Sequence, residues 1–245
     1  MRISPLTLLL VILLIATLGF TSVRRTQGVS NKQTPQREQI KKDHFPTAEY
    51  EEPDLADARK NRLRKEKQKR HNNFKIVSSS PAEWQAERVF IGEGAFNFPA
   101  LPVERSAYIL IGKVADAQAH VSENKKNVYS EFTVSVERVL KTAKSSIMEG
   151  SEITVDRIGG HVKYPDGRSV LYRIAQTNMP AIDGRYVFFI TSINNEDYTL
   201  VTAYGIEAQG VVPLDDSPQF EEMRGLSEEA FLRNLQEFLA KSSAN

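Results

Sequence analysis

The first 23 residues constrain this chain more than any other stretch, because they are almost entirely apolar. After Arg2, none of the 21 residues from Ile3 to Val23 carries a charge. In a helix they rise about 31 Å, close to the thickness of the hydrocarbon core of a bilayer. We therefore expect residues 1–23 to form a transmembrane anchor or a signal peptide, physically separate from the folded body of the protein.

The flanks of this apolar run decide between anchor and signal peptide, and they also bear on orientation. No Ala-x-Ala pattern occurs near Ala16 and Gly19, and a cleavable signal needs small residues three before and one before the cut. This favours an uncleaved anchor, with a signal peptide as the alternative. Arg24 and Arg25 would keep the body in the cytoplasm by the positive-inside rule, whereas the short leader is typical of an export signal. We favour a single-pass membrane protein whose soluble domain is extracytoplasmic.

The small net charge hides a division between two segments. From Arg24 to Lys75 there are 15 Lys and Arg against 8 Asp and Glu, whereas from Ile76 to Asn245 there are 16 against 23. We predict that residues 24–83 are a charged, largely disordered linker in which residues 54–73 can form a helix. The chain has no cysteine, which excludes disulfides, Cys-ligated zinc and thiol nucleophiles.

The basic part of the linker is the first candidate binding motif. Its cationic side chains could contact polyanions, and the candidates are Arg59, Lys60, Arg62, Arg64, Lys65, Lys67, Lys69 and Arg70. The favoured interpretation is a solvated spacer. Anionic lipids or cell-surface polymers come next, and nucleic acid is the least favoured partner because the acidic body would repel phosphates. The opposite charges of the two segments also fit a linker that folds back on its own domain.

The sequence of the body predicts a series of β-strands. Strands are expected at 106–114, 128–140, 153–158, on both sides of the 164–168 turn, and at 185–193, 198–204 and 210–214, with a break at Gly159-Gly160. We predict an all-β domain at residues 84–216, and prefer a small OB-like β-barrel to a sandwich because a barrel has no open edges. Residues 217–245 would form a connector and an amphipathic helix. Its stripe of Phe231, Leu235, Phe238 and Leu239 would plug one end of the barrel.

No catalytic or metal-binding motif stands out, and we predict no cofactor or metal. Neither H-E-x-x-H nor G-x-S-x-G occurs. His161 has Asp156 and Asp166 nearby in sequence, but an ordinary, partly exposed histidine is the favoured interpretation. The pair Asp215-Asp216 lies beside proline in a connector, where solvated loop charge is more common than acid–base catalysis.

Two aromatic clusters are candidates for surface recognition. Tyr164, Arg168, Tyr172 and Arg173 surround the Asp-Gly turn, and aromatic and arginine side chains are typical interface anchors. The favoured alternative is that the two tyrosines pair across a hairpin and shield the barrel. The lead-in segment at 90–102, rich in phenylalanine and proline, should pack on the barrel wall; a groove for a partner is the less favoured interpretation.

The order of the strand motifs also carries a resemblance. The segments SAYILIGKV, YSEFTVSVERVLK, SEITVDR, DGRYVFFI and DYTLVTAYG resemble those of poorly characterised bacterial exported or anchored β-domains. More distantly, residues 105–214 are similar to the OB-like barrel of netrin and metalloproteinase-inhibitor modules. The resemblance implies a fold and an interaction role, with no site residue. Those inhibitors use an N-terminal cysteine and disulfides, which this chain lacks, so their mechanism is not implied.

These observations predict a membrane-anchored, non-enzymatic β-barrel that binds an unknown protein or another partner in the cell envelope. The alternative is a cell-envelope enzyme or enzyme inhibitor. A deep pocket lined by His161, Asp156 and Arg168 would favour that alternative.

Overall fold

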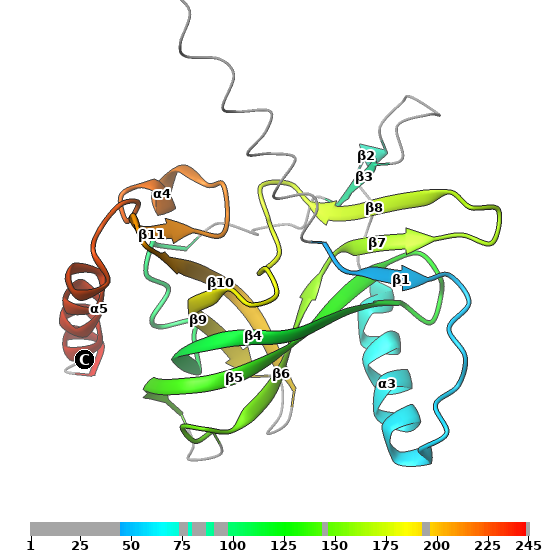
Figure 1. The fold of residues 1–245 in the computed structure, drawn as a ribbon, viewed down its shortest axis with the longest axis horizontal. Helices are drawn as coiled ribbons and strands as arrows, with labels where there is room; N and C mark the ends of the chain where they lie inside the picture. Colours follow the sequence, from blue (N-terminus) through cyan, green and yellow to red (C-terminus); the bar gives the residue numbers. More distant parts are fainter. Residues whose placement is uncertain are drawn as a thin grey trace, which may run out of the picture. The chain divides into compact units, whose positions relative to one another are not determined.

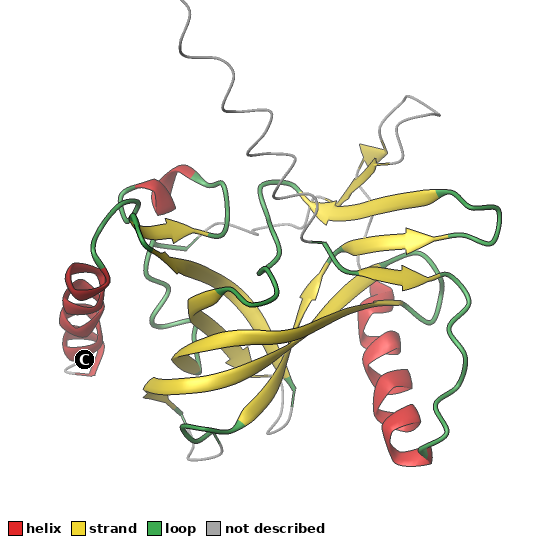
Figure 2. Cartoon of the chain, viewed as in Figure 1, coloured by secondary structure: helices red, strands yellow, loops and turns green. Residues whose placement is uncertain are grey.

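The computed structural model describes residues 45–73, 78–79, 87–90, 98–143, 147–192 and 197–243 (Figure 1). These residues form mostly β-strands with few helices, so the all-β prediction is confirmed (Figure 2). The predicted anchor at 1–23 and the linker up to residue 44 lie outside the described residues. Among the helices that the structure describes, none combines the length and the apolarity needed to cross a bilayer.

The larger sheet has six strands, and five of them close on themselves. Its members are β4 (Tyr108–Val121), β5 (Val128–Thr142), β6 (Glu152–Ile158), β9 (Arg185–Ser192), β10 (Tyr198–Glu207) and β11 (Gly210–Pro213), in the order β11-β10-β6-β5-β4-β9. Strand β10 also pairs with β9, so β4, β5, β6, β10 and β9 each pair with two others of these five and form a ring, and β11 is added to β10 outside it. Only β6 and β10 pair in parallel within this ring.

The interior of the ring is filled by apolar side chains. Leu110, Phe132 and Phe188 have no exposed surface and belong to one hydrophobic cluster. Because successive residues in a strand point to opposite sides, Ile109 and Phe189 lie on the outside of the same strands. There they join a second cluster. Strands β4 and β9 are therefore buried on both faces.

Two helices follow the last strand, α4 (Pro218–Glu221) and α5 (Glu228–Ser243). Helix α5 contributes Phe231 and Leu235 to the outer cluster. The helix therefore packs on the wall of the ring, and the expectation that it plugs one end is wrong. Phe238 is 45% exposed, so the predicted apolar stripe is only partly buried.

A second sheet lies at the far end of the long β4–β5 hairpin. It contains β1 (Thr47–Glu49), β7 (Gly160–Lys163), β8 (Ser169–Ile174), β3 (Glu87–Phe90) and β2 (Ser78–Ser79), in the order β1-β7-β8-β3-β2. The chain passes from β6 to β7 through Gly159 and Gly160, whose φ angles are +117° and +148°. A Cβ on Gly160 would lie 2.9 Å from the Cβ of Ala119. Both the positive φ angles and the close packing require glycine, and the predicted strand break is confirmed.

Residues 45–73 differ from the prediction of a largely disordered linker. Strand β1 pairs in parallel with β7, and Phe45 and Ala48 are buried. The chain continues into α3 (Ala58–Arg70) and a short 3-10 turn, η1 (His71–Asn73), so the expected helix at 54–73 is present in a shorter form. We call residues 45–73 the arm. Its binding to the strands corresponds to the fold-back alternative, and the reason lies in the charges described next.

Candidate functional site

Charged side chains hold helix α3 on the strands. Asp57 caps it, accepting hydrogen bonds from the backbone nitrogens of Arg59 and Lys60 at 2.9 and 3.0 Å. No residue of the helix itself is buried. An amphipathic helix normally packs through an apolar stripe, and α3 has none, so its position must depend on ion pairs.

Those ion pairs join α3 to the ring strands. Lys67 Nζ lies 2.6 Å from Glu131 Oε1 on β5. Arg70 pairs with Asp156 on β6 and, at 3.1 Å, with Asp197 just before β10. Three carboxylates from different strand segments therefore converge on the basic end of one helix (cyan in Figure 1).

His120 forms the centre of one half of this interface. Its Nδ1 lies 3.0 Å from Glu52 of the arm, and its Nε2 lies 3.5 Å from Glu131. Burial disfavours the charged ring, but the hydrogen bonds with Glu131 and Glu52 outweigh it and raise the pKa of His120 to about 9. Burial likewise opposes the Glu131 carboxylate, yet His120 and Lys67 lower its pKa to about 2. The histidine is thus a cationic bridge between arm and ring.

Asp156 forms the centre of the other half. It is fully buried and accepts a hydrogen bond from Thr199 Oγ1 at 2.7 Å. His71 Nε2 lies 3.4 Å from its carboxylate, and Arg70 completes the set. Burial raises the pKa of Asp156, but these partners, His71 first, outweigh it, so that the pKa is lowered. The carboxylate is therefore held as an anion beneath the arm.

Tyr129 separates the two halves. The His71 ring stacks on it with centroids 4.2 Å apart, and His120 lies at 5.3 Å. Its hydroxyl is buried, with no hydrogen-bond partner among the described residues, and burial raises its pKa. Asn127 Nδ2 donates to the His71 carbonyl at 2.8 Å. The two histidines, the tyrosine and their carboxylates form an enclosed polar cluster that fixes the end of α3.

The eight polyanion candidates therefore divide into two groups. Arg64, Lys67 and Arg70 are half-buried and face carboxylates of the protein itself, so they are not available to an external anion in this structure. The remaining five, Arg59, Lys60, Arg62, Lys65 and Lys69, are exposed. The sequence grouped all eight as one motif because it does not show which side faces the strands.

A second buried ion pair corrects the interpretation of Asp215. Both of its oxygens accept from Arg157, at 2.8 and 2.7 Å. Thr202 Oγ1 and the backbone nitrogen of Asn178 also donate to it. Asp215 has no exposed surface, so the prediction of solvated loop charge is wrong. The pair connects β6 with the segment after β11 and has a structural role.

The predicted hairpin cluster forms in part. Tyr164 and Tyr172 are joined through their hydroxyls at 2.8 Å, and Tyr172 is buried. Tyr50 stacks on Tyr164 with centroids 4.8 Å apart, and the Arg168 guanidinium lies 5.6 Å above the same ring. This matches the expected alternative of pairing across the hairpin. Arg173 lies further along β8.

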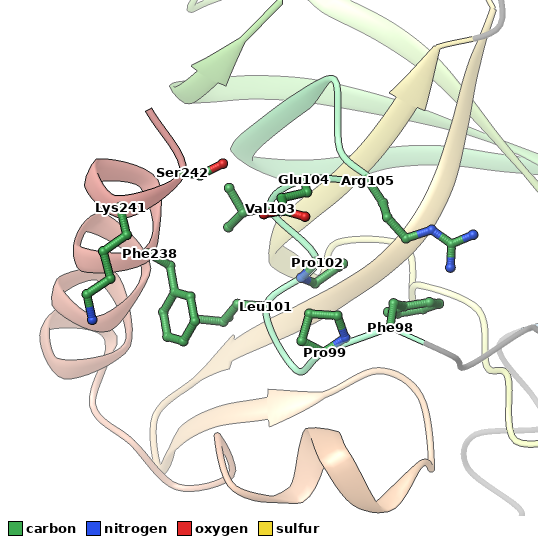
Figure 3. A pocket seen from close by; sticks show the side chains of 10 residues that line it. All are labelled: Phe98, Pro99, Leu101, Pro102, Val103, Glu104, Arg105, Phe238, Lys241 and Ser242. Atoms are coloured by element: carbon green, nitrogen blue, oxygen red, sulfur yellow. The ribbon is translucent and has the colours of Figure 1, made fainter. Parts of the chain in front are cut away.

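The lead-in segment forms one side of an open groove of about 480 Å³. Residues 98–105 face the C-terminal half of α5 across it, with Phe98, Leu101 and Phe238 among the lining side chains (Figure 3). The Arg105 guanidinium lies 5.3 Å above the Phe98 ring, and Lys241 Nζ lies 5.7 Å above the Phe238 ring. The sequence indicated this groove only as the less favoured interpretation of the phenylalanine- and proline-rich segment.

The structure does not bring together the three residues expected of an enzyme. Asp156 lies beneath α3, Arg168 is exposed in the β7–β8 turn, and the His161 ring contacts Phe45 edge-on. None of the three lines the groove beside α5 or the smaller pocket next to it.

Comparison with protein-family models gave no match, and comparison with curated proteins gave no significant one. The function is therefore inferred from this chain's own geometry.

Proposed function

We propose that this protein is a membrane-anchored, non-enzymatic binding module. Residues 1–23 would hold it in the membrane, and the domain would present its binding surface outside the cytoplasm. The uncharged run from Ile3 to Val23 supports the anchor. The domain is rigid for two reasons. Apolar side chains fill its ring, and ion pairs such as Lys67–Glu131 and Arg157–Asp215 join its elements.

We propose further that the ring is an OB-like barrel. The support is its pairing order: β4, β5 and β6 run antiparallel in succession, β10 joins β6 in parallel, and β9 closes the ring against β10 and β4. A five-stranded barrel of this kind exposes little backbone for further pairing. It suits a module that recognises its partner through side chains on its surface.

The groove of Figure 3 is the single observation that carries the binding role. It is open, its lining is mainly apolar, and Phe238 on its edge is 45% exposed. Exposed aromatic and arginine side chains are enriched at protein interfaces. We therefore infer that the partner is a protein that inserts apolar side chains between residues 98–105 and α5.

Site-specific photocrosslinking in intact cells tests this function. A photoreactive phenylalanine analogue at position 238 should give one discrete adduct with a partner protein. The same analogue at Ile182, which is also exposed, should give none. Arg105→Glu, a surface change at the groove, should weaken the adduct. Equal labelling from both positions would overturn the groove as binding site, and protection of the domain from external protease would overturn the extracytoplasmic placement.

A further inference from the structure

The groove beside α5 continues into the smaller pocket next to it. This pocket, of about 350 Å³, shares Val103 and Ser242 with the groove. Its other lining residues come from the end of β5 and the last turns of α5, and they are Leu140, Lys141, Thr142, Leu239 and Ala240. The groove and the pocket therefore form one depression along the C-terminal half of α5, which we call the extended groove. Its first part is the groove of Figure 3.

The extended groove offers apolar surface to an incoming side chain. Leu101 and Val103, which line it, are buried in the outer hydrophobic cluster, and Leu140 and Leu239 pack against the same cluster. Phe238 remains 45% exposed. Removal of apolar surface from water is the main driving force of protein association. The extended groove therefore suits a partner that inserts apolar side chains.

Cations dominate the charged part of the lining. Arg105, Lys141 and Lys241 line the extended groove, and Glu104 is the only carboxylate among the described residues that line it. Arg105 and Lys241 are exposed, and neither forms an ion pair with any residue that the structure describes. Each lies above an aromatic ring of the groove, an arrangement that leaves N–H donors free on the side away from the ring. Both side chains can therefore receive a carboxylate from outside.

The charge of this lining has the opposite sign to that of the body. The chain from Ile76 onward carries 23 acidic against 16 basic residues, whereas the lining has three cations and one carboxylate. We propose that the extended groove recognises a partner segment whose apolar side chains are flanked by aspartate or glutamate. This inference rests on the proposed function of the groove and adds the chemistry of the partner. The acidic remainder of the body would repel such a segment, so complementary charge confines it to the groove.

Two other occupants fit less well. Residues 24–44 of this chain carry six Lys and Arg against two Asp and Glu, so the cations of the groove would repel them. A fatty acyl chain is bound best where most of its surface is enclosed, and this groove is open. A protein segment covers an open groove with its own backbone and polar side chains, as an amphipathic helix does.

Selection of phage-displayed random peptides on the full-length chain, held in phosphatidylcholine nanodiscs, tests this chemistry. We expect the enriched peptides to combine leucine, isoleucine or phenylalanine with neighbouring aspartate or glutamate. Fluorescence anisotropy of a labelled synthetic copy of the most enriched peptide should show binding that weakens as salt is raised, because partly exposed ion pairs are screened. Enrichment of neutral or basic sequences, enrichment of none, or binding independent of salt would overturn the proposal.

Two variants with the same change in net charge locate the binding. Arg105→Glu together with Lys241→Glu should weaken binding of the enriched peptide about tenfold, and a new selection on this variant should enrich lysine and arginine beside the apolar residues. Lys126→Glu together with Lys163→Glu, at exposed positions of the β4–β5 turn and β7, should change neither result. Equal weakening in the two variants would overturn the groove as the site of recognition.

A third variant keeps the test independent of charge reversal. Phe238→Ala leaves every charge in place and removes exposed apolar surface from the groove, so it should also weaken the peptide. Thermal unfolding followed by circular dichroism checks that each variant is folded. Unchanged binding to folded Phe238→Ala would contradict apolar anchoring in the groove.

Photocrosslinking from position 238 distinguishes this inference from the proposed function. A discrete adduct in cells, combined with enriched peptides that carry no carboxylates, would retain the groove as binding site and overturn its preference for acidic segments. Absence of both the adduct and any enriched peptide would contradict the proposed function itself. Binding of a fluorescent fatty acid, reduced by Phe238→Ala, in place of any peptide would assign the groove to lipid and overturn the proposal.

Discussion

The ring of strands and the arm are held by different forces. In the ring, Phe132 and Phe188 are fully buried in an apolar cluster, whereas no residue of α3 is buried and the helix depends on ion pairs. Salt screens partly exposed ion pairs and weakens them, whereas apolar burial is not weakened by screening. The difference teaches that one chain can contain a stable platform and an attachment that solution conditions can loosen.

The largest expected effect is on the ring. Phe188→Ala should lower the free energy of unfolding by about 3–5 kcal/mol, because it leaves a cavity in the interior. Urea denaturation followed by circular dichroism measures this. Phe238→Ala, at an exposed position, should change stability by less than about 0.5 kcal/mol. Equal effects of the two substitutions would contradict the assignment of the core.

Loss of the buried Arg157–Asp215 ion pair should lower the free energy of unfolding nearly as much as loss of a buried phenylalanine. Asp215→Ala leaves the buried guanidinium of Arg157 without its carboxylate, and we expect a loss of about 3 kcal/mol in unfolding free energy. Asp116→Ala is the control, since Asp116 is exposed. If Asp215→Ala were as mild as its control, the buried pair would not be structural.

Loss of an ion pair between the arm and the ring should change hydrogen exchange in the arm alone. Arg70→Ala removes a partner of both Asp156 and Asp197, and we expect the arm to open more easily by about 2 kcal/mol. Hydrogen exchange should accelerate at residues 58–70 and stay unchanged in β4 and β9. Arg62→Ala, whose only described ion pair is exposed, should change neither. Faster exchange throughout the ring would show that arm and ring unfold together.

The smallest effect concerns pH. Because the folded pKa of His120 is about 9 and the ordinary pKa of histidine is 6.5, its contribution is fully present below about pH 6.5 and is lost as the pH rises through 9. Glu131, with a folded pKa of about 2 against 4.5, contributes above pH 4.5. After correction for intrinsic exchange, opening of α3 should increase about tenfold between pH 8 and pH 10, or about 1.3 kcal/mol. His120→Gln should abolish this dependence, and its persistence in that variant would exclude His120 as the cause.

The same contrast explains what the sequence could predict. Alternation in β5 placed Phe132 and Val134 on one face, and both are buried. The turn at Gly167 and the break at Gly159-Gly160 followed from local backbone requirements, and all three glycines have positive φ. Local patterns thus sufficed for most strands and turns. The closing of the ring, by contrast, depends on the parallel contact of β6 with β10, which are about 40 residues apart.

Most of the candidate site could not be predicted from the sequence. The partners of α3 lie on β5, β6 and the start of β10, so no local pattern connects them. Asp215 resembled a surface residue because its partner Arg157 is 58 positions away. Charged side chains are usually solvated, and only the fold shows which ones are not. The nearest sequence signal for the arm was the opposite net charge of the two segments.

Strand β1 has a mechanical consequence if residues 1–23 anchor the chain in a membrane, as we propose. It is three residues long and lies at the edge of its sheet. Any tension transmitted along the chain from upstream reaches this short strand first, then the capped helix and its ion pairs, and only afterwards the ring. Under load the arm would therefore detach before the ring unfolds. Its detachment would lengthen the tether by some 29 residues.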